Sequence, residues 1–282
     1  MTSGKLYLVG VSIGNYGDMT YRAVETLKSV DVIAAEDTRK ARHLLTHFQI
    51  KPEKLIAHHA HNEADSAKGL LTFLNEGKSI ALITDAGMPT ISDPGYQAAK
   101  HVRAGGGVVE VIPGVSAVPT ALAASGLPAE DFRFIGFLPR KSGDIKKVLQ
   151  PFETSQTTLV LFESPRRIVK ALEAIAQQLG DRQICLCREL TKQHEEFIGG
   201  TITEVLANLN SRDAILGEMT LVVEGAAKDA GQKDLEGDDL ESEISAMLEQ
   251  GMKTKEIRDV LADKYGLNKG DVYQKTLEIQ KK

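Results

Sequence analysis

An apolar run at residues 80–83 leads the chain into Ile83-Thr84-Asp85-Ala86-Gly87-Met88-Pro89-Thr90-Ile91-Ser92-Asp93-Pro94-Gly95. This segment combines glycine and proline punctuation with two carboxylates, and a helical pattern is expected to restart at Asp93. In an α/β layer, a nucleotide-like ligand meets backbone amides and acidic acceptors where a strand passes through a loop into a helix. A second junction spans residues 108–117 and ends in Ile112-Pro113-Gly114-Val115-Ser116-Ala117. Two such junctions close together in the sequence predict a ligand pocket.

The composition is that of a globular protein with more than one core. A length of 282 residues favours two or more domains. The chain has no apolar stretch long enough to span a bilayer, and its N-terminus lacks the basic and apolar segments of a secretion signal. We therefore expect a cytoplasmic protein without membrane contact. Cys185 and Cys187 alternate along an apolar run, which predicts core packing rather than a metal site.

The formal net charge of −5 argues against a bulk attraction to nucleic acid. Local basic clusters nevertheless follow apolar runs, where loops gather at one edge of a sheet. They are Arg39-Lys40 with Arg42 and His43, Arg140-Lys141 with Lys146-Lys147, and Arg166-Arg167. The sequence leaves open whether these clusters are solvated helix faces or a phosphate-binding surface.

The hydrophobic pattern divides the chain into two α/β lobes. In the first lobe, at 1–126, short apolar runs alternate with amphipathic segments, which is typical of a mostly parallel sheet covered by helices. Those runs are 6–9, 32–35, 55–57, 80–83 and 108–112. In the second lobe, at 127–225, the expected strands are 132–137, 158–162, 184–187, 196–198 and 219–223. A helix is expected at 165–179, beginning at Pro165 and ending at Gly180. Because fewer helices separate these strands, the second sheet should contain both parallel and antiparallel pairs. The crevice between the two lobes is then the expected ligand site.

The C-terminal part has a different character. Residues 226–240 are small, charged and poor in large apolar side chains, which is typical of a linker. Short helices are expected beyond it at 241–250, 255–264 and 270–282. The span 252–273 resembles a helix-turn-helix, although any small helical bundle carries the same punctuation. The sequence leaves open whether this helical domain, 241–282, contacts RNA.

Two common nucleotide-binding motifs are absent. The first glycine-rich loop reads Gly10-Val11-Ser12-Ile13-Gly14-Asn15-Tyr16-Gly17, which does not satisfy the G-x-G-x-x-G pattern of dinucleotide-binding proteins. No G-x-x-x-x-G-K-[ST] loop occurs either. The sequence therefore disfavours an oxidoreductase or a P-loop enzyme.

A set of motifs in a fixed order covers residues 5–225. It comprises 9–17, Ala35-Glu36-Asp37-Thr38-Arg39, 84–95, 112–117, Leu161-Phe162-Glu163-Ser164-Pro165-Arg166-Arg167, Cys187-Arg188-Glu189-Leu190-Thr191-Lys192 and Gly217-Glu218. This order resembles the tetrapyrrole-methylase-like, or class III, S-adenosylmethionine methyltransferases. The Glu-Asp-Thr-Arg and Glu-Ser-Pro-Arg-Arg elements are similar to those of the subgroup that acts on ribosomal RNA.

The resemblance implies a fold and an activity. The implied protein is a homodimer of two-lobed subunits, with a mostly parallel N-terminal sheet, a mixed second sheet and a small C-terminal helical domain. The implied cofactor is S-adenosylmethionine. The implied reaction is methyl transfer to the ribose 2′-oxygen of a decoding-centre (P-site) cytidine in 16S small-subunit rRNA, either as free RNA or within the small ribosomal subunit.

The cofactor residues are expected at both junctions and in the second lobe. Backbone groups at 85–89 suit the amino acid end and the sulfur, because small residues allow close approach. Ser116 and Ala117 begin a helix whose free amides suit the carboxylate, and Phe162 suits the adenine. The full expected set is Asp85, Ala86, Gly87, Met88, Pro89, Asp93, Pro113, Gly114, Ser116, Ala117, Phe162, Glu163, Met219 and Thr220. Phe162 as a core residue and Asp93 as a helix cap are the open alternatives.

A ribose hydroxyl is a poor nucleophile, so we expect a carboxylate or histidine to accept its proton. Asp37 is favoured, Glu36 is second and His61 is third. The alternative for Asp37 is a helix cap or an ion pair with Arg39, and the alternative for the histidine is a solvated loop position.

Arginines are expected to bind the RNA phosphates, because the guanidinium presents a planar fork of donors. The expected residues are Arg39, Arg140, Arg166 and Arg167. Arg188 and Glu189 are instead expected to pair with each other beneath the cofactor.

Two other functions compete with rRNA methylation. Methylation of a porphyrin-like small molecule would use the same cofactor lobes. A non-catalytic RNA-binding assembly factor would need no cofactor. The arginine loops and the appended helices favour rRNA methylation, since neither has an obvious use with a small macrocycle.

Overall fold

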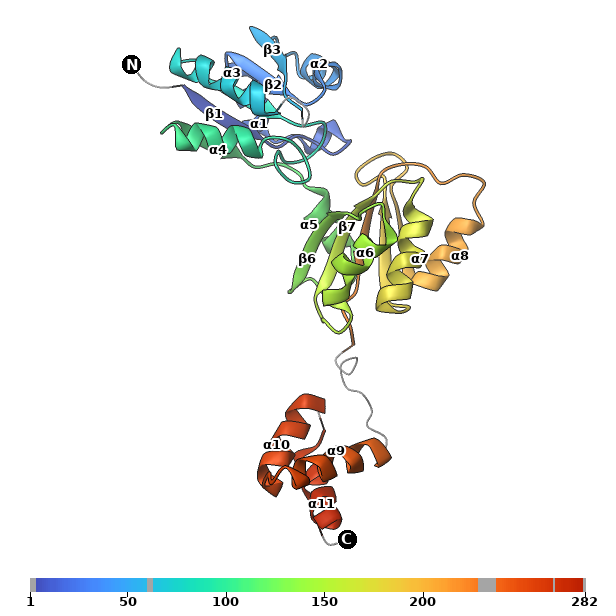
Figure 1. The fold of residues 1–282 in the computed structure, drawn as a ribbon. Helices are drawn as coiled ribbons and strands as arrows, with labels where there is room; N and C mark the ends of the chain where they lie inside the picture. The colour runs from blue at the N-terminus through green and yellow to red at the C-terminus, as the bar shows by residue number, and fades with distance from the viewer. Residues whose placement is uncertain (1–3, 60–62, 228–236, 266, 281–282) are drawn as a thin grey trace.

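The computed structural model describes residues 4–59, 63–227, 237–265 and 267–280. It confirms the α/β class, with a parallel sheet in the first lobe and a mixed sheet in the second. The two lobes lie one above the other, and a bundle of C-terminal helices lies apart from both (Figure 1). No helix in the described ranges has the length and apolar character needed to cross a membrane.

The first sheet has the strand order β3-β2-β4-β1-β5, and every neighbouring pair is parallel. Its strands are β1 (Lys5–Val9), β2 (Val32–Ala35), β3 (Lys54–Ala57), β4 (Ile80–Ile83) and β5 (Val108–Ile112). The central strands β2 and β4 are buried along their whole length. Continuous apolar runs form such strands because both faces of a parallel sheet are covered.

Helices cover the two faces of this sheet in pairs. Leu27 of α1 (Tyr21–Ser29) and Leu44 of α2 (Thr38–His47) pack on one face. Leu70 of α3 (Glu63–Asn75) and Val102 of α4 (Tyr96–Ala104) pack on the other. Because all strands run parallel, the loops after β1, β2, β4 and β5 meet at the carboxyl edge of the sheet, where ligands bind in such folds.

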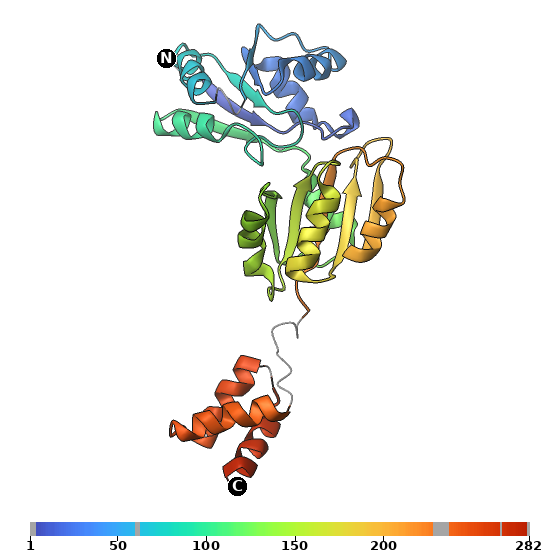
Figure 2. The same cartoon turned by 45° about the vertical axis from the view of Figure 1, so that its right-hand side comes forward.

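The second sheet has the order β6-β7-β10-β8-β9, with β6 and β7 parallel and the other pairs antiparallel. Its strands are β6 (Phe132–Phe137), β7 (Thr158–Glu163), β8 (Gln183–Arg188), β9 (Glu196–Thr201) and β10 (Met219–Val223). One face carries α6 (Ser142–Leu149), α7 (Ile168–Leu179) and α8 (Ile202–Asn210). In the turned view, α7 crosses in front of the strands of this sheet (Figure 2).

Helix α5 (Ala117–Ser125) covers the opposite face of the second sheet. Its Val118, Ala121 and Leu122 share a core with Cys185 and Cys187 of β8. The expected lobe boundary at 126 therefore needs correction. The chain crosses from one lobe to the other between Ile112 and Ala117, because the apolar side of α5 finds its partner surface on the second sheet.

Two expected helix starts also need correction. Helix α4 begins at Tyr96 rather than Asp93, because the chain up to its N-cap residue Gly95 stays in a loop. Helix α7 begins at Ile168 rather than Pro165, and the turn before it is closed by amides of Arg167 and Ile168 donating to the Ser164 carbonyl. The end of α7 at Gly180 is as expected.

The C-terminal bundle consists of α9 (Gly237–Glu249), α10 (Thr254–Tyr265) and α11 (Lys269–Gln280). Ile244, Ile257, Leu261 and Val272 form its buried centre. The bundle thus has its own core.

Candidate active site

A cavity of about 400 Å³ lies between the carboxyl edge of the first sheet and the second lobe. Its volume is that of a site for a small-molecule ligand. It is lined by Ile13, Glu36, Asp85, Ala86, Gly87, Met88, Ile91, Ser92, Asp93, Ser116, Ala117, Phe137, Phe162, Glu163, Ser164, Pro165, Leu190, Gly217, Glu218, Met219 and Thr220. Both lobes contribute, so the site depends on their mutual position.

The loop between β4 and α4 forms one wall of this cavity. Gly87 has a φ of +70°, and its carbonyl accepts a 2.9 Å hydrogen bond from the Val11 amide. Thr90 and Ser92 have φ values of 77° and 62°, which L residues rarely adopt. Such residues persist only where the surrounding structure enforces them, and they cluster at functional sites. A similar pair, Glu189 and Thr191, flanks the lining residue Leu190 in the second lobe.

The N-terminus of α5 opens into the cavity at Ser116 and Ala117. Ser116 is the N-cap residue, but no side chain caps this end of the helix. Uncapped amides and the helix dipole make such an end suitable for a carboxylate ligand.

Carboxylates dominate the charge of the cavity. Asp85 links two loops of the first lobe: its Oδ1 accepts from the Asp37 amide at 3.1 Å, and its Oδ2 accepts from Lys40 Nζ at 2.7 Å. The Asp85 amide in turn donates to Glu36 Oε2 at 3.1 Å. The bond to Asp85 raises the pKa of Lys40 above its usual value.

Two further carboxylates come from the second lobe. Glu163 is buried and lies 3.3 Å from Arg167 Nη2, which also donates to the carbonyls of Leu138 and Pro139 at 2.7 and 3.0 Å. Glu218 Oε2 accepts from Lys192 Nζ at 2.9 Å. Both carboxylates thus have a local cation.

Asp93 is half-buried in the cavity wall. Burial raises the pKa of Asp93 to about 7, and the nearby charges of Glu36 and Asp85 add to the rise. Asp93 does not cap α4, whose N-cap is Gly95. A carboxyl group that titrates near neutral pH in a ligand cavity is able to exchange protons with a substrate.

Asp37 adopts the structural role that the sequence left open. Its carboxylate caps α2 through the Arg39 amide at 2.8 Å and accepts Arg39 Nε and Nη2 at 3.1 and 2.7 Å. The hydrogen bonds from Arg39 hold the pKa of Asp37 well below its usual range. Asp37 also does not line the cavity. These contacts disfavour Asp37 as a proton acceptor, whereas Glu36 lines the cavity, and His61 lies outside the described residues.

The cavity brings together most of the residues expected to bind the cofactor. They are Asp85, Ala86, Gly87, Met88, Asp93, Ser116, Ala117, Phe162, Glu163, Met219 and Thr220. The backbone positions Pro89, Pro113 and Gly114 do not line it. Phe162 is half-buried, with its ring centroid 4.9 Å from that of Phe134 and 5.8 Å from that of Phe137.

Several lining residues were not expected from the sequence. Ile13, Phe137 and Leu190 add apolar surface. Ile13 and Leu190 lie within the recognised motifs, so the motifs themselves carried a usable signal for them. Phe137 carried none, because its ring reaches the site only through the pairing of β6 with β7.

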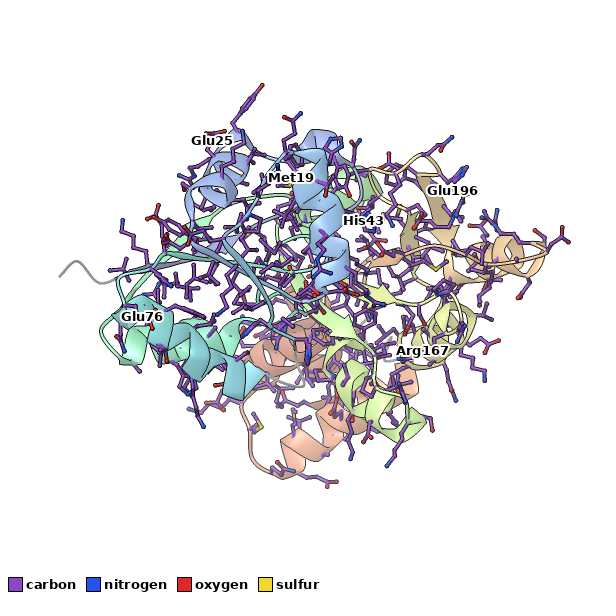
Figure 3. All side chains as sticks on the ribbon, turned by 90° about the horizontal axis from the view of Figure 1, so that it is seen from above. Met19, Glu25, His43, Glu76, Arg167 and Glu196 are labelled. Carbon is purple, nitrogen blue, oxygen red and sulfur yellow. The ribbon has the colours of Figure 1, made fainter. Side chains whose placement is uncertain are left out.

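A second cavity of about 340 Å³ adjoins the first, and Asp85 lines both. It lies over α2 and the loop after β1, and includes Tyr16, Lys40 and His43. Figure 3 shows His43 on α2. The Tyr16 ring is supported by His47 at 4.5 Å and Phe48 at 6.0 Å between centroids.

The four expected phosphate-binding arginines differ in their surroundings. Arg140 and Arg166 are exposed. The Arg39 side chain is 83% exposed although it pairs with Asp37. Arg167 also contacts Glu163 and the carbonyls of Leu138 and Pro139 after β6, which gives its guanidinium a structural role within the second lobe. Figure 3 shows Arg167 within the second lobe.

The expected pair of Arg188 and Glu189 also needs correction. Arg188 Nε donates to Glu196 at 2.8 Å, and Glu189 Oε1 accepts from Lys192 Nζ at 3.0 Å. The pairing of β8 with β9 explains the partner of Arg188, because residue 188 lies directly opposite Glu196.

The described residues include no group of His, Cys, Asp and Glu arranged to hold a metal ion.

Comparison with known proteins gives one family. The profile described as Tetrapyrrole (Corrin/Porphyrin) Methylases matches residues 5–206. The chain is 42% identical over 272 residues to a protein of Halalkalibacterium halodurans named ribosomal RNA small subunit methyltransferase I, covering 96% of this chain and 93% of that protein. Proteins of the same name from Bacillus subtilis and Escherichia coli O157:H7 are 48% and 42% identical. The former match covers 79% of this chain and 76% of the relative, and the latter 99% and 96%.

Solved structures share the two-lobed fold at low identity. The methyltransferase CobJ matches with a TM-score of 0.61 at 21% identity, over 80% of this chain and 95% of that one. Diphthine synthase matches with a TM-score of 0.64 at 16% identity, over 79% and 90%. At such identities these likenesses bear on the fold alone.

Proposed function

Since this chain belongs to the tetrapyrrole (corrin/porphyrin) methylase family, alongside the ribosomal RNA small subunit methyltransferases I, we propose that it methylates small-subunit rRNA with S-adenosylmethionine. In finer detail, we propose the ribose 2′-oxygen of a decoding-centre (P-site) cytidine in 16S rRNA as the acceptor. The observation that carries the proposal is the interlobe cavity, which combines carboxylates, an uncapped helix N-terminus and an apolar wall.

The cavity fits the charges of S-adenosylmethionine. The donor has a sulfonium and an ammonium, and the cavity offers carboxylates of which Asp93 has no local cation within the described residues. The N-terminus of α5 at Ser116 suits the carboxylate of the amino acid end. Apolar side chains at Phe162 and Leu190 suit the adenine. We therefore assign the cofactor to this cavity.

The bound cofactor supplies an electrophilic methyl group attached to positively charged sulfur. The chain's own contribution is to hold the sugar oxygen in line with that group, and such positioning supplies up to roughly 7–11 kcal/mol in favourable cases. The burial of Glu163 and the partial burial of Asp93 strengthen the interaction of these carboxylates with a cation, because the local dielectric is lower than that of water. The acceptor hydroxyl also needs a base, worth roughly 10²–10⁴-fold.

The RNA is proposed to approach over α2. Asp85 lines both cavities, and the second cavity is also lined by the partly exposed ring of Tyr16, against which an unstacked base is proposed to stack. Arg39, Arg140 and Arg166 expose guanidinium groups for phosphates. The C-terminal bundle is proposed as a further RNA contact. These features support a polynucleotide over a porphyrin-like acceptor or a non-catalytic role.

We further propose a homodimer in the cytoplasm, where ribosomal subunits are found. Edge strand β5 exposes Val108 and Val111, each 47% accessible, and Tyr21 of α1 is 95% accessible. An unpaired edge with exposed apolar side chains supports association with a second copy. Light scattering of the purified chain tests this, and a monomer at micromolar concentration would refute it.

The function is tested with labelled cofactor and small subunits from a strain that lacks this protein. We expect label in 16S rRNA within an alkali-resistant linkage, because a 2′-O-methyl group prevents the hydroxyl from attacking its phosphate. Label on a base, or label only on a porphyrin-like compound, would contradict the proposal.

Truncation after Gly225 tests whether the C-terminal bundle contacts RNA. Unchanged affinity of the truncated chain for small subunits would show that the bundle takes no part in RNA binding.

A further inference from the structure

Asp93 brings into the interlobe cavity a carboxylate that no described side chain engages. The other carboxylates of the cavity are occupied: Asp85, Glu163 and Glu218 by cations, and Glu36 by an amide. Within the described part of the chain, no hydrogen bond or ion pair joins the Asp93 carboxylate. Asp93 is half-buried and lines the cavity together with Met88 and Ser92 of the same loop.

The backbone around Asp93 is held in an unusual conformation. Thr90 and Ser92 both adopt left-handed φ values, and the Thr90 amide donates to the Pro94 carbonyl at 3.2 Å. This small closed loop keeps Asp93 in the cavity wall instead of allowing it to continue into α4. A conformation that disfavours folding is retained where it positions a functional group.

We propose that Asp93 is the general base that accepts the proton of the RNA sugar hydroxyl, and that the adjacent sulfonium keeps it ionised until transfer. This inference rests on the proposed function. The carbon–sulfur bond breaks with its electron pair left on sulfur, the sugar oxygen bonds to the methyl carbon, and the hydroxyl proton passes to Asp93. One cation and one carboxylate are thereby replaced by a neutral sulfide and a neutral carboxylic acid.

The surrounding charges explain why the ionisation of Asp93 depends on the positive charge of the donor. Glu36 and Asp85 face Asp93 and, with burial, raise its pKa to about 7. The cations at the cavity are committed to other carboxylates: Lys40 to Asp85, Arg167 to Glu163 and Lys192 to Glu218. A cationic donor therefore supplies the missing positive charge, lowers the pKa of Asp93 and prepares it to accept a proton. After transfer that charge is gone, and the neutral acid is again the favoured form.

The first test measures protons rather than turnover. Donor binding to the full chain is followed by calorimetry in buffers of different ionisation enthalpy, with S-adenosylmethionine and its neutral sulfide product S-adenosylhomocysteine. We expect release of about half a proton per donor at pH 7, and close to none with the product. Donor affinity should rise with pH through about 7. Donor binding without proton release would overturn the inference.

The second test uses Asp93→Asn, with Asp144→Asn on the exposed side of α6 as the matched control. Asp93→Asn should bind the donor more weakly than the unchanged chain at pH 8, with a difference that shrinks as pH falls, release no proton at pH 7 and lose about 10²–10⁴-fold in methyl transfer. Asp144→Asn should retain both properties. Transfer by Asp93→Asn within twofold of the unchanged chain would overturn the inference.

Different results would refute the proposed function and the role of Asp93. If the unchanged chain binds no donor and methylates no subunit, the proposed function fails and this inference fails with it. If the donor binds and the methyl group is transferred but no proton is released, the role of Asp93 alone is refuted. The proton measurement on the unchanged chain does not depend on whether Asp93→Asn folds.

Discussion

Gly10 and Gly114 face each other so closely that a Cβ atom on either would lie 2.7 Å from the backbone of the other. The Gly10 amide also donates to the Ile112 carbonyl at 2.9 Å. The loop after β1 and the loop between β5 and α5 therefore touch through their backbones. This contact fixes where α5 begins, and with it the position of Ser116 in the cavity. Neither glycine is exchangeable for a residue with a side chain.

Gly114→Ala should consequently disturb the cofactor end of the site. Overpacking of this kind costs about 1–3 kcal/mol of unfolding free energy, and the displaced loop should weaken donor binding. Thermal unfolding and calorimetry measure both effects. Gly143→Ala is the control: a Cβ there meets nothing within 4 Å in α6, and alanine should stabilise the helix by up to about 1 kcal/mol. Equal behaviour of the two variants would contradict the packing argument.

Neighbouring arginines should respond differently to the same change. Arg167→Met leaves buried Glu163 without its cation and two carbonyls without a donor, so we expect a loss of about 1–3 kcal/mol in stability. Arg166→Met should leave stability unchanged and weaken RNA binding, with a shallower dependence on salt concentration. Chemical denaturation and filter binding separate the effects. The assignment fails if Arg167→Met is as stable as the unchanged chain.

The raised pKa of Asp93 should appear in the stability of the cofactor-free protein. The folded chain keeps this proton up to a pH of about 7, whereas the unfolded chain releases it near 3.8, the usual pKa of an aspartate. Stability contributed by the neutral acid is complete below the unfolded value and is lost as pH rises through about 7. Asp93→Asn should therefore unfold at a higher temperature than the unchanged chain at pH 8, with a smaller difference at pH 5. A difference independent of pH would contradict the raised pKa.

Strands were the part of the fold most accessible from sequence. The runs at 32–35 and 80–83 match β2 and β4, because continuous burial in a parallel sheet leaves an uninterrupted apolar pattern. The run at 108–112 matches β5 although Glu110 interrupts it, since this strand lies at the edge of the sheet. Helix starts were harder to predict. Asp93 and Pro165 both have the local character of a first turn, but a loop continues to Gly95 and a turn closes on the Ser164 carbonyl, so α4 and α7 begin three residues later.

The site could be predicted only where backbone and loop motifs define it. Gly87 and Ser116 could be predicted as site residues because each lies where a strand passes through a loop into a helix. A glycine marks the point where a ligand approaches the backbone closely, and the start of a helix marks free amides. The difference between Asp37 and Asp93 leaves no such pattern. It depends on Arg39 folding back onto Asp37 and on the burial of Asp93 opposite Glu36, which arise only when separate loops come together.

Tyr16 tests the proposed RNA side of the site. Tyr16→Ala should lower kcat/KM for RNA by about tenfold or more, because stacking of a base on an aromatic ring contributes about 1–3 kcal/mol. Donor affinity should not change, since Tyr16 lines only the second cavity. Tyr16→Phe should retain activity, because it keeps the ring. Full activity of Tyr16→Ala would remove the second cavity from the path of the nucleotide.

The most direct measurement is a crystal structure of this chain with S-adenosylmethionine bound. We expect the donor in the interlobe cavity, with its amino acid carboxylate at Ser116, its sulfur near Gly87 and its methyl group directed toward Asp93 and Asp85. A donor bound elsewhere, or a cavity that stays empty at saturating donor, would contradict this expectation.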